Sequence, residues 1–267
     1  MTRSSKNRWK GLACFLLFLC LFLFTVVYTQ CDPVLFWKRR SHLTDLLSGM
    51  FPMDFAYIPH ILTPLFYTIQ MSVTGTVIGS VLACILAPAC AGSMDFPKWI
   101  RYVLRFLIQI LRSFPALILA LCATFLFGLG TFAGTFAITL YTFAIMTRLT
   151  YQDMEAASPL AYQALRTMGV SRFPAYIHGL FPEIAPSFFT NALYMLETNV
   201  RHSSILGYVG AGGIGLLLNE KISWLEYEKV GAILLVLFLA VFIIENLSRY
   251  LAALIRKECT LKKKYIK

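Results

Sequence analysis

Six runs of predominantly apolar residues constrain the fold more strongly than any other feature of this sequence. Each is close to the roughly 20 residues with which a helix crosses the hydrocarbon core of a bilayer. Inside a bilayer, only helices and closed barrels satisfy the hydrogen-bonding groups of their own backbone. The sequence therefore predicts an all-α fold, a single transmembrane domain over residues 1–267 that is a polytopic bundle of about six helices, with spans at approximately residues 12–29, 65–90, 106–127, 131–150, 186–207 and 230–254.

The composition excludes the soluble classes of protein. Only 14% of the residues are charged and 58% are hydrophobic, whereas a soluble domain has about 25% charged residues. A net charge of +11 would indicate nucleic-acid binding in a soluble chain, but here most of the 24 Lys and Arg residues lie in connections on one side of the predicted spans. The positive-inside rule then predicts cytoplasmic N- and C-termini, and we expect no nucleic-acid partner.

The first apolar run has two interpretations. It follows four basic residues within the first ten, as the apolar part of a signal peptide does. However, it is longer than a usual signal-peptide core, and Tyr28-Thr29-Gln30 is not a small-x-small cleavage site. We expect an uncleaved first helix. A short amphipathic helix on the outer surface should follow, with an apolar stripe of Leu43, Leu46, Leu47 and Met50.

No pattern indicates catalysis, a metal site or a cofactor site. The seven cysteines include no C-x-x-C pair, and no histidine lies near one of them at metal-ligand spacing. No stretch matches G-x-x-x-x-G-K-[ST], so we expect no ATP site in this chain. The sequence predicts a protein that is not an enzyme, has no catalytic residue and needs no cofactor.

Residues 151–185 connect the fourth and fifth predicted spans on the cytoplasmic side. Ser158-Pro159 is typical of a helix start, with Ser as the cap and Pro at the first position. The helix over 160–168 should end at Gly169, and a second helix should begin near Ser171 and stop around Pro182. Such a helical elbow is a shape that another protein can bind. The alternative is a loop that packs beneath its own bundle.

This elbow resembles the EAA loop of ABC-transporter permeases, whose pattern is Glu-Ala-Ala-x3-Gly-x9-Ile-x-Leu-Pro. Ala164, Gly169 and Pro182 match the pattern, whereas other residues replace its Glu, second Ala, Ile and Leu. In that family the loop docks in a groove of the ATP-hydrolysing subunit. The resemblance implies an ATPase-coupling loop made of Gln163, Ala164, Leu165, Gly169, Phe181 and Pro182.

Further motifs resemble the phosphonate-type branch of these permeases, over about residues 45–255. They are Phe51-Pro52 with Asp54, Tyr57 with Pro59, Arg112-Ser113-Phe114-Pro115, the set Glu197, Asn199 and Arg201, and the run from Ile205 to Gly215. The resemblance implies the permease subunit of an ATP-driven importer in the bacterial inner membrane, for phosphonate or a related phosphorus oxyanion. It also implies a homodimer in membrane lipid, two cytoplasmic ABC ATPase subunits and an extracytoplasmic substrate-binding protein.

Charged residues in the fifth predicted span are the strongest candidates for the translocation pathway. Tyr194, Glu197, Arg201 and Ser204 recur at helical spacing and should form one polar stripe. A charge at membrane depth costs about 2.5–3.5 kcal/mol and usually faces a bundle interior or a water-filled cavity. Glu197 and Arg201 are either a structural ion pair or part of a wall where Arg201 meets an oxyanion. The neighbouring His202 should turn about 100° away and act as a structural donor.

The glycines that follow this span satisfy G-x-G-x-x-G at Gly210, Gly212 and Gly215, with Gly213 between them. A dinucleotide site would need a preceding strand, whereas here a membrane helix precedes the run. We therefore expect a tight re-entrant or gating turn. Elsewhere, Glu245 with Arg249 should form a structural pair, and Gly75 with Gly79 a close helix-packing face.

Other functional classes are weaker fits to the sequence. An ion-coupled secondary transporter would carry its own ion-coupling site at midmembrane, and a single Glu/Arg pair provides few ligands for such a site. An intramembrane enzyme would need a motif such as H-E-x-x-H or paired aspartates within the spans, and none is present. An ABC permease for a different small solute remains the other alternative.

Overall fold

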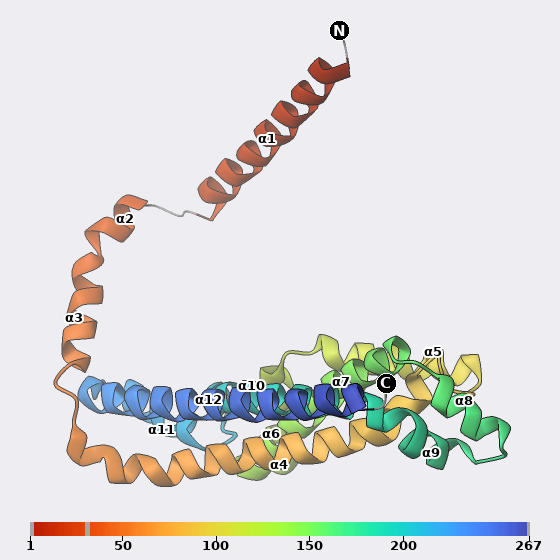
Figure 1. The fold of residues 1–267 in the computed structure, drawn as a ribbon. Helices are drawn as coiled ribbons and strands as arrows, with labels where there is room; N and C mark the ends of the chain where they lie inside the picture. Colours follow the sequence, from red (N-terminus) through yellow and green to blue (C-terminus); the bar gives the residue numbers. More distant parts are fainter. Residues whose placement is uncertain (1–2, 30–32, 266–267) are drawn as a thin grey trace. The chain divides into compact units, whose positions relative to one another are not determined.

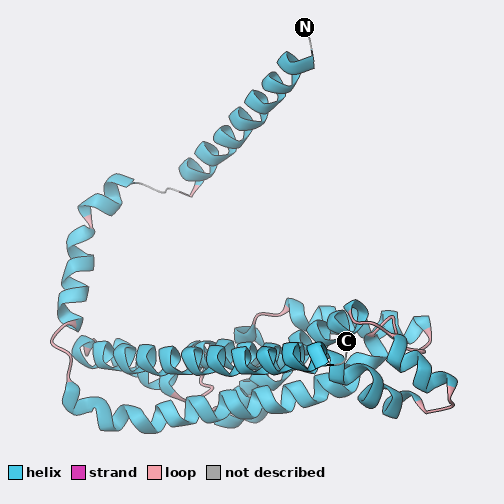
Figure 2. Cartoon of the chain, in the orientation of Figure 1, coloured by secondary structure: helices cyan, strands magenta, loops and turns pink. Residues whose placement is uncertain are grey.

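The computed structural model describes the backbone of residues 3–29 and 33–265, and the side chains of residues 11–29, 34 and 37–255. Every regular element in these ranges is helical, in agreement with the predicted fold class (Figure 2). The chain divides into two compact units, Met1–Phe51 and Pro52–Lys267.

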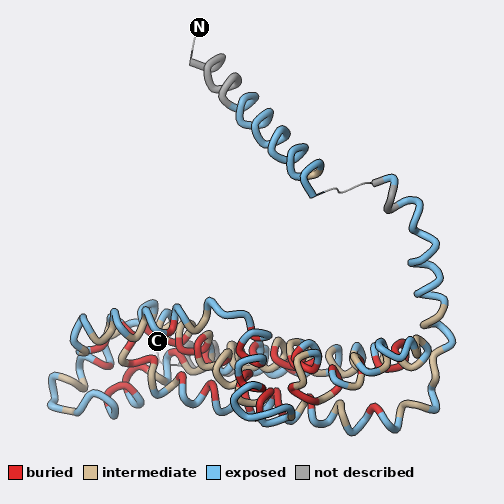
Figure 3. The backbone as a smooth tube through the Cα atoms, turned by 180° about the vertical axis from the view of Figure 1, so that it is seen from behind, coloured by how far each residue is buried: buried red, intermediate tan, exposed pale blue. Residues whose placement is uncertain are grey.

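The described residues of the first unit form the helices α1 (Arg3–Tyr28), α2 (Pro33–Lys38) and α3 (Arg40–Met50). The segment Gly11–Tyr28 of α1 is apolar enough to cross a membrane, and none of it is buried within the protein (Figure 3). The amphipathic helix predicted around Leu43 is confirmed as α3, whose stripe residues Leu43, Leu46 and Leu47 are all exposed. Both helices therefore expose apolar side chains that suit lipid.

The second unit contains the remaining elements (Figure 1). They are η1 (Phe55–Tyr57), α4 (Ile58–Cys90), α5 (Lys98–Ser113), α6 (Ala116–Phe127), α7 (Thr131–Ala156), α8 (Leu160–Thr167), α9 (Arg172–Ala175), η2 (Tyr176–Leu180), α10 (Phe181–Leu206), η3 (Gly207–Val209), α11 (Ile214–Ser223) and α12 (Tyr227–Tyr265). Buried residues lie along its interior (Figure 3).

The connections of this unit gather at two ends. At one end, which we call the α8 end, the backbone N–H of Gly92 donates to Glu155 (2.7 Å), and Arg166 donates to Asp95 (2.9 Å). At the other, the α11 end, the N–H of Gly130 donates to the carbonyl of Gly210 (2.9 Å). The chain passes between these ends along α4, α5–α6, α7, α10 and α12 (Figure 1).

The most extensive helix contact joins α4 and α7, and two glycines allow the backbones to approach. A Cβ atom at Gly79 would lie 2.8 Å from the Thr139 carbonyl oxygen, and one at Gly75 would lie 2.6 Å from Cγ2 of Ile138. Real Cβ atoms essentially never approach this closely, so only glycine permits this spacing of the two backbones. The predicted packing role of these two glycines is confirmed.

The predicted span at 106–127 is wrong as a single helix. Its residues belong to α5 and α6, which meet at an angle of 91°. Phe114 has extended ψ of 127° and Pro115 follows with ψ of 146°. The bend arises because proline lacks a backbone N–H and disfavours helical geometry in the preceding residue.

The other boundaries also differ from the prediction, mostly by extension. α4 begins at Ile58, α7 continues to Ala156 and α12 starts at Tyr227. The predicted helix stop at Pro182 is wrong, because η2 is a π-helical turn that leads directly into α10. The N–H of Phe181 bonds the carbonyl of Tyr176, five residues back. Such a turn accommodates Pro182, which cannot donate and would crowd an α-helical carbonyl.

Four described helices are long and apolar enough to cross a membrane, or up to five if α5–α6 is one broken span. They contain Gly11–Tyr28, Phe55–Cys90, Thr131–Ala156 and Tyr227–Ile255. α10 has 26 residues, but its polar side chains leave it outside this set. The count of six spans therefore stays a prediction.

The cysteines behave as isolated side chains where the structure describes them. Cys14, Cys20, Cys84, Cys90 and Cys122 are free. Cys31 and the side chain of Cys259 lie outside the described residues. Within the described part of the chain, no group of three or more His, Cys, Asp or Glu residues has the arrangement of a metal site.

Candidate functional site

The predicted pair on α10 forms as an ion pair. Arg201 Nη2 lies 2.9 Å from Glu197 Oε1, one helical turn away. The Glu197 side chain is only 16% exposed, whereas that of Arg201 is 57% exposed. Glu197 therefore anchors the pair in the bundle, and Arg201 retains donors that face outward for another acceptor.

The predicted polar stripe is only partly correct. Tyr194 is exposed on the same side of α10 as the ion pair. Ser204 is buried, and its hydroxyl donates to the backbone carbonyl of Arg201 (2.7 Å). A serine that bonds its own helix backbone in this way is occupied and turned away from solvent. Ser204 thus supports the helix and does not extend the exposed stripe.

A groove of about 490 Å³ between α10 and α12 brings the two predicted ion pairs together. Glu197 and Arg249 both line it, and Arg249 pairs with Glu245 one turn away on α12. The remaining lining residues are Thr190, Leu193, Tyr194, Ser248, Ala252 and Ala253. The predicted structural pair of α12 therefore borders the same polar surface as the predicted pathway residues.

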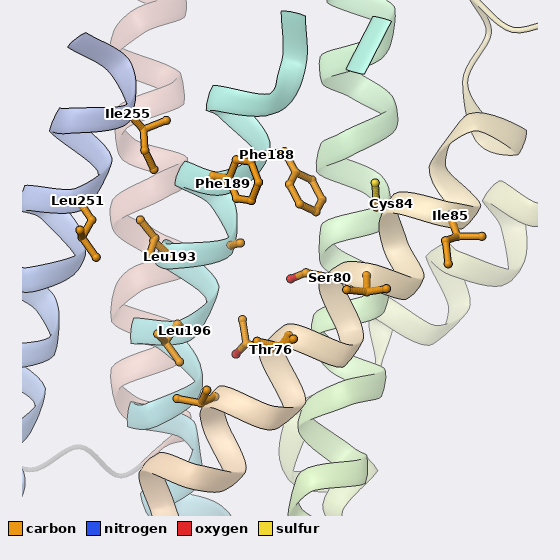
Figure 4. Close-up of a pocket in the computed structure, with 14 residues that line it drawn as sticks. Thr76, Ser80, Cys84, Ile85, Phe188, Phe189, Leu193, Leu196, Leu251 and Ile255 are labelled. Carbon is orange, nitrogen blue, oxygen red and sulfur yellow. The ribbon is translucent and has the colours of Figure 1, made fainter. Parts of the chain in front are cut away.

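A second groove, of about 590 Å³, lies between α4, α10 and α12 and has a different character (Figure 4). Phe188, Phe189 and Leu193 line it from α10, and Leu251 from α12. Thr76 and Ser80 add hydroxyl groups, but almost all of the lining is apolar. This surface suits hydrocarbon chains, and an anion would lose its hydration there without compensation.

A buried polar contact that the sequence analysis missed fastens α10 to its neighbours. Asn199 is fully buried, and its side-chain amide donates to Thr76 on α4 (2.8 Å) and Thr142 on α7 (2.7 Å). Asn199 lies between Glu197 and Arg201 in sequence, so this contact fixes the rotation of α10. The ion pair consequently points away from α4 and α7.

The glycine-rich run forms the predicted tight turn. Gly210, Gly212 and Gly213 all have positive φ, between 71° and 81°. A Cβ at Gly215 would overlap the backbone carbonyl of Ser204, so α11 folds directly back against α10. The preceding element is helical, as expected, and no described residue forms a strand. The tight turn is therefore confirmed, whereas its re-entrant position in the membrane and a gating role stay predictions.

The elbow between α8 and α9 closes as predicted at Gly169. This glycine has a φ of 86°, its N–H bonds the carbonyl of Arg166 (3.0 Å), and Val170 bonds that of Leu165 (3.1 Å). These two bonds are the Schellman motif of a helix end. The predicted Ser158 cap is wrong, because Pro159 occupies the cap position and no side-chain cap bond forms.

Two contacts hold the elbow on the bundle. Arg166 Nε donates to Oδ2 of Asp95 (2.9 Å), which lies between α4 and α5, and Nη1 donates to the carbonyl of Val170 (2.7 Å). The hydrogen bond from Arg166 lowers the pKa of the Asp95 carboxyl below its ordinary value. A Cβ at Gly179 would lie 2.9 Å from the backbone of Tyr162, so α8 packs directly on η2. The elbow therefore packs on the segment that leads directly into α10.

The predicted coupling residues divide into an exposed set and a packed set. Gln163, Ala164, Gly169 and Pro182 are exposed. Leu165 and Phe181 pack against one buried cluster that contains Tyr162 and Tyr176. Large apolar side chains at both ends of α8 face outward, since Leu160 is 72% and Met168 69% exposed. The elbow thus presents an apolar surface on a rigid support.

Comparisons with known proteins agree with this geometry. Residues 79–257 match a family described as binding-protein-dependent transport system inner membrane component. The phosphite transport system permease protein PtxC of Stutzerimonas stutzeri is 30% identical over 85% of this chain and 84% of its own length.

A second relative and a solved structure also match the chain. The phosphate-import permease protein PhnE of Mycolicibacterium smegmatis is 30% identical over 84% of this chain, which spans 42% of that longer protein. Among solved structures, the inward-facing MetNI methionine ABC transporter matches 76% of this chain and 99% of its own, with 20% identity and a TM-score of 0.65. That likeness concerns the fold.

Proposed function

The chain belongs to the family of binding-protein-dependent transport system inner membrane components, and we propose that it is the permease subunit of an ATP-driven importer of phosphonate or a related phosphorus oxyanion. The relatives from M. smegmatis and S. stutzeri are named for phosphate and phosphite, which are both phosphorus oxyanions. A guanidinium group such as that of Arg201 pairs with these anions through charge-assisted hydrogen bonds.

The observation that carries the proposal is the braced elbow. Exposed Leu160 and Met168 give it an apolar surface for a partner, while the contacts of Arg166 and Gly179 prevent it from moving separately from the bundle. In this proposal two copies of the chain form the pathway, and the elbow of each docks an ABC ATPase subunit in the cytoplasm. A substrate-binding protein delivers the anion on the opposite side of the membrane.

Continuity between the elbow and α10 supplies the coupling route. Residues 172–206 run through α9, η2 and α10 without a break, from the proposed ATPase contact to Arg201. Closure of the ATPase dimer would push on α8 and tilt α10, because α8 packs on η2. Such a rigid-body movement alternately opens the two sides of the pathway. The chain itself then needs no nucleotide site.

Purification and uptake test the proposal directly. The tagged chain, expressed in its native host, should co-purify with an ATPase in equal amounts. Reconstituted with the binding protein, it should take up radiolabelled phosphite, phosphonate or phosphate only when ATP is present. Uptake driven by an ion gradient without ATP would instead identify a secondary transporter.

Gly169 offers a specific test of the docking surface. Its positive φ disfavours a β-branched residue by about 1–3 kcal/mol, and open space around it leaves backbone strain as the main effect. Gly169→Val should therefore reduce co-purification of the ATPase, whereas Gly169→Asn should retain it, because Asn tolerates this conformation. Both variants should insert normally. Full ATPase binding and transport by Gly169→Val would show that the elbow is not the docking site.

A further inference from the structure

A third cavity, of about 420 Å³, lies where the chain breaks between α5 and α6. Arg112 and Ser113 line it from the end of α5, and Tyr141 from α7 and His202 from α10 complete its polar part. Tyr141 is about 15 Å from the start of α7, a helix of 26 residues that is about 39 Å long. The cavity is therefore far from both ends of that helix.

Arg112 differs from the charged residues of the α10–α12 groove because it has no partner. Arg201 and Arg249 each pair with a glutamate on their own helix. Among the described residues, no carboxylate or other acceptor bonds the half-buried Arg112 side chain, and no residue that lines its cavity is an aspartate or glutamate. Beside the middle of a long apolar helix, a positive charge without a carboxylate partner favours the binding of an anion.

Neutral hydrogen-bond donors surround the same space. Ala116 and Leu117, the first residues of α6, line the cavity, and N–H groups in a first helical turn have no acceptor within the helix. Partial positive charge at this helix start favours an anion. His202 contacts Tyr141 edge to face, with ring centroids 5.5 Å apart. Its predicted role as a structural donor is not seen, because no hydrogen bond of its ring occurs within the described structure.

We propose that this cavity binds the phosphorus oxyanion during its passage, with Arg112 as the charged ligand and the start of α6 and His202 as hydrogen-bond donors. The inference rests on the proposed function and adds a binding site that is distinct from the Glu197–Arg201 pair. A tetrahedral oxyanion fits because its oxygens accept hydrogen bonds from several directions at once. Broken helices form anion sites of this kind in other transporters.

Chemical modification of Arg112 tests binding without requiring transport. The purified complex in nonionic detergent is treated with phenylglyoxal, and the labelling of each arginine is measured by mass spectrometry. Inorganic phosphate should slow labelling of Arg112 at least about threefold relative to potassium chloride at equal ionic strength, because a bound anion covers the guanidinium group. Labelling of Arg39, which is exposed and lines none of the three cavities, serves as the control and should not change. Equal labelling of Arg112 in both salts would overturn the proposal.

A lipid headgroup carries the same phosphate chemistry, so a further arm separates the two sources. Phosphatidylglycerol is added to the detergent in place of inorganic phosphate. Protection by the lipid alone would assign the cavity to a headgroup and overturn the proposal. Protection by inorganic phosphate, with or without the lipid, would support it.

Uptake by the reconstituted transporter then tests the role in transport. Arg112→Gln should lower phosphite uptake at least about tenfold at matched amounts of assembled complex, because a charge-assisted contact is lost. Lys98→Gln removes the same charge from the exposed start of α5 and should transport normally. Wild-type uptake by Arg112→Gln would overturn the inference alone. Absence of uptake by the wild-type protein would instead contradict the proposed function, and phosphate protection of Arg112 would still decide the binding site.

Discussion

At the scale of single residues, the question is whether Glu197 and Arg201 form only a structural ion pair, or whether Arg201 also contacts the substrate. Glu197 is mostly covered, so its loss would leave a cation without compensation near a polar groove. If the pair were purely structural, removal of both charges would restore function, because neither charge would then lack a partner. If Arg201 also contacts the substrate, the double substitution cannot restore transport.

We expect the second outcome. Arg201→Gln and the double variant Arg201→Gln/Glu197→Gln should both lose phosphite uptake by about tenfold or more, because the contact to the anion is charge-assisted. Arg201→Lys keeps the charge and should retain more uptake than either. Uptake and ATP hydrolysis are measured at matched amounts of assembled complex. Normal transport by the double variant would leave Arg201 with a structural role only.

Gly215 makes a second prediction at this scale. A methyl group there would overlap the Ser204 carbonyl, and neither backbone can move easily because both elements are packed together. Gly215→Ala should lower the apparent melting temperature of the detergent-solubilised protein by about 6 °C or more, as overpacking costs about 1–3 kcal/mol or more. Gly11→Ala is the matched control, since nothing lies near Gly11. An unchanged melting temperature for Gly215→Ala would show that α11 is not fixed against α10.

The sequence predicted residue contacts well where they depend on helical period alone. The pairs at 197/201 and 245/249 formed because residues four apart share a helix face. Asn199 was not predicted to join Thr76, because the two are 123 residues apart and a single sequence carries no signal for such a contact. The prediction for Ser204 was wrong for a related reason. Helical periodicity gives the side of α10 on which Ser204 lies, but it does not indicate that α11 covers that side.

At the scale of elements, two prolines explain two of the errors in the predicted helix boundaries. Pro115 interrupts an apolar run that composition alone favours as one span, and it creates the break beside Arg112. Pro182 was expected to end a helix, yet the helical segment continues through it from η2 into α10. The π-turn before it absorbs the steric conflict, and the sequence has no clear signal for such a turn.

The elbow carries a prediction about pH. The hydrogen bond from Arg166 lowers the folded-state pKa of Asp95 below the unfolded value of 3.8. The contribution of this bond to stability is therefore fully present above that value and is lost as the pH falls through the lower, folded-state pKa. Hydrogen exchange of α8, corrected for intrinsic rates, should show protection at pH 7 that declines below about pH 4.

Asp95→Asn provides the control for that experiment. The variant cannot form the charge-assisted contact, so its α8 should be less protected at pH 7 and should show a smaller change on acidification. Because Arg166 and Asp95 are both substantially exposed, the difference should be modest. Equal protection in the two proteins at pH 7 would mean that Gly179 and Tyr162 hold the elbow without the ion pair.

At the scale of the whole chain, charge separates the two ends of the second unit. At the α8 end, residues 91–105 and 148–185 contain six Lys or Arg residues and four Asp or Glu residues. At the α11 end, residues 52–57 and 207–229 contain two Lys residues and four Asp or Glu residues. The positive-inside rule favours a cytoplasmic α8 end, which is also the end that carries the elbow.

Orientation leads to a prediction that depends on the number of crossings. The segments α4, α5–α6, α7, α10 and α12 each pass between the two ends. Together with α1 they make six membrane crossings, an even number, so both termini should lie in the cytoplasm. A fluorescent reporter fused after Lys267 should be active in the cytoplasm, and alkaline phosphatase inserted near Arg39 should be active outside it. Met168→Cys, at the exposed elbow, should react with a membrane-impermeant thiol reagent only after the membrane is permeabilised, in a background that lacks the native cysteines.

An extracytoplasmic C-terminus combined with a cytoplasmic elbow would mean that α10 and α12 together make a single crossing. That result would remove Arg201 from the membrane-spanning pathway, because polar α10 would then be the helix that does not cross.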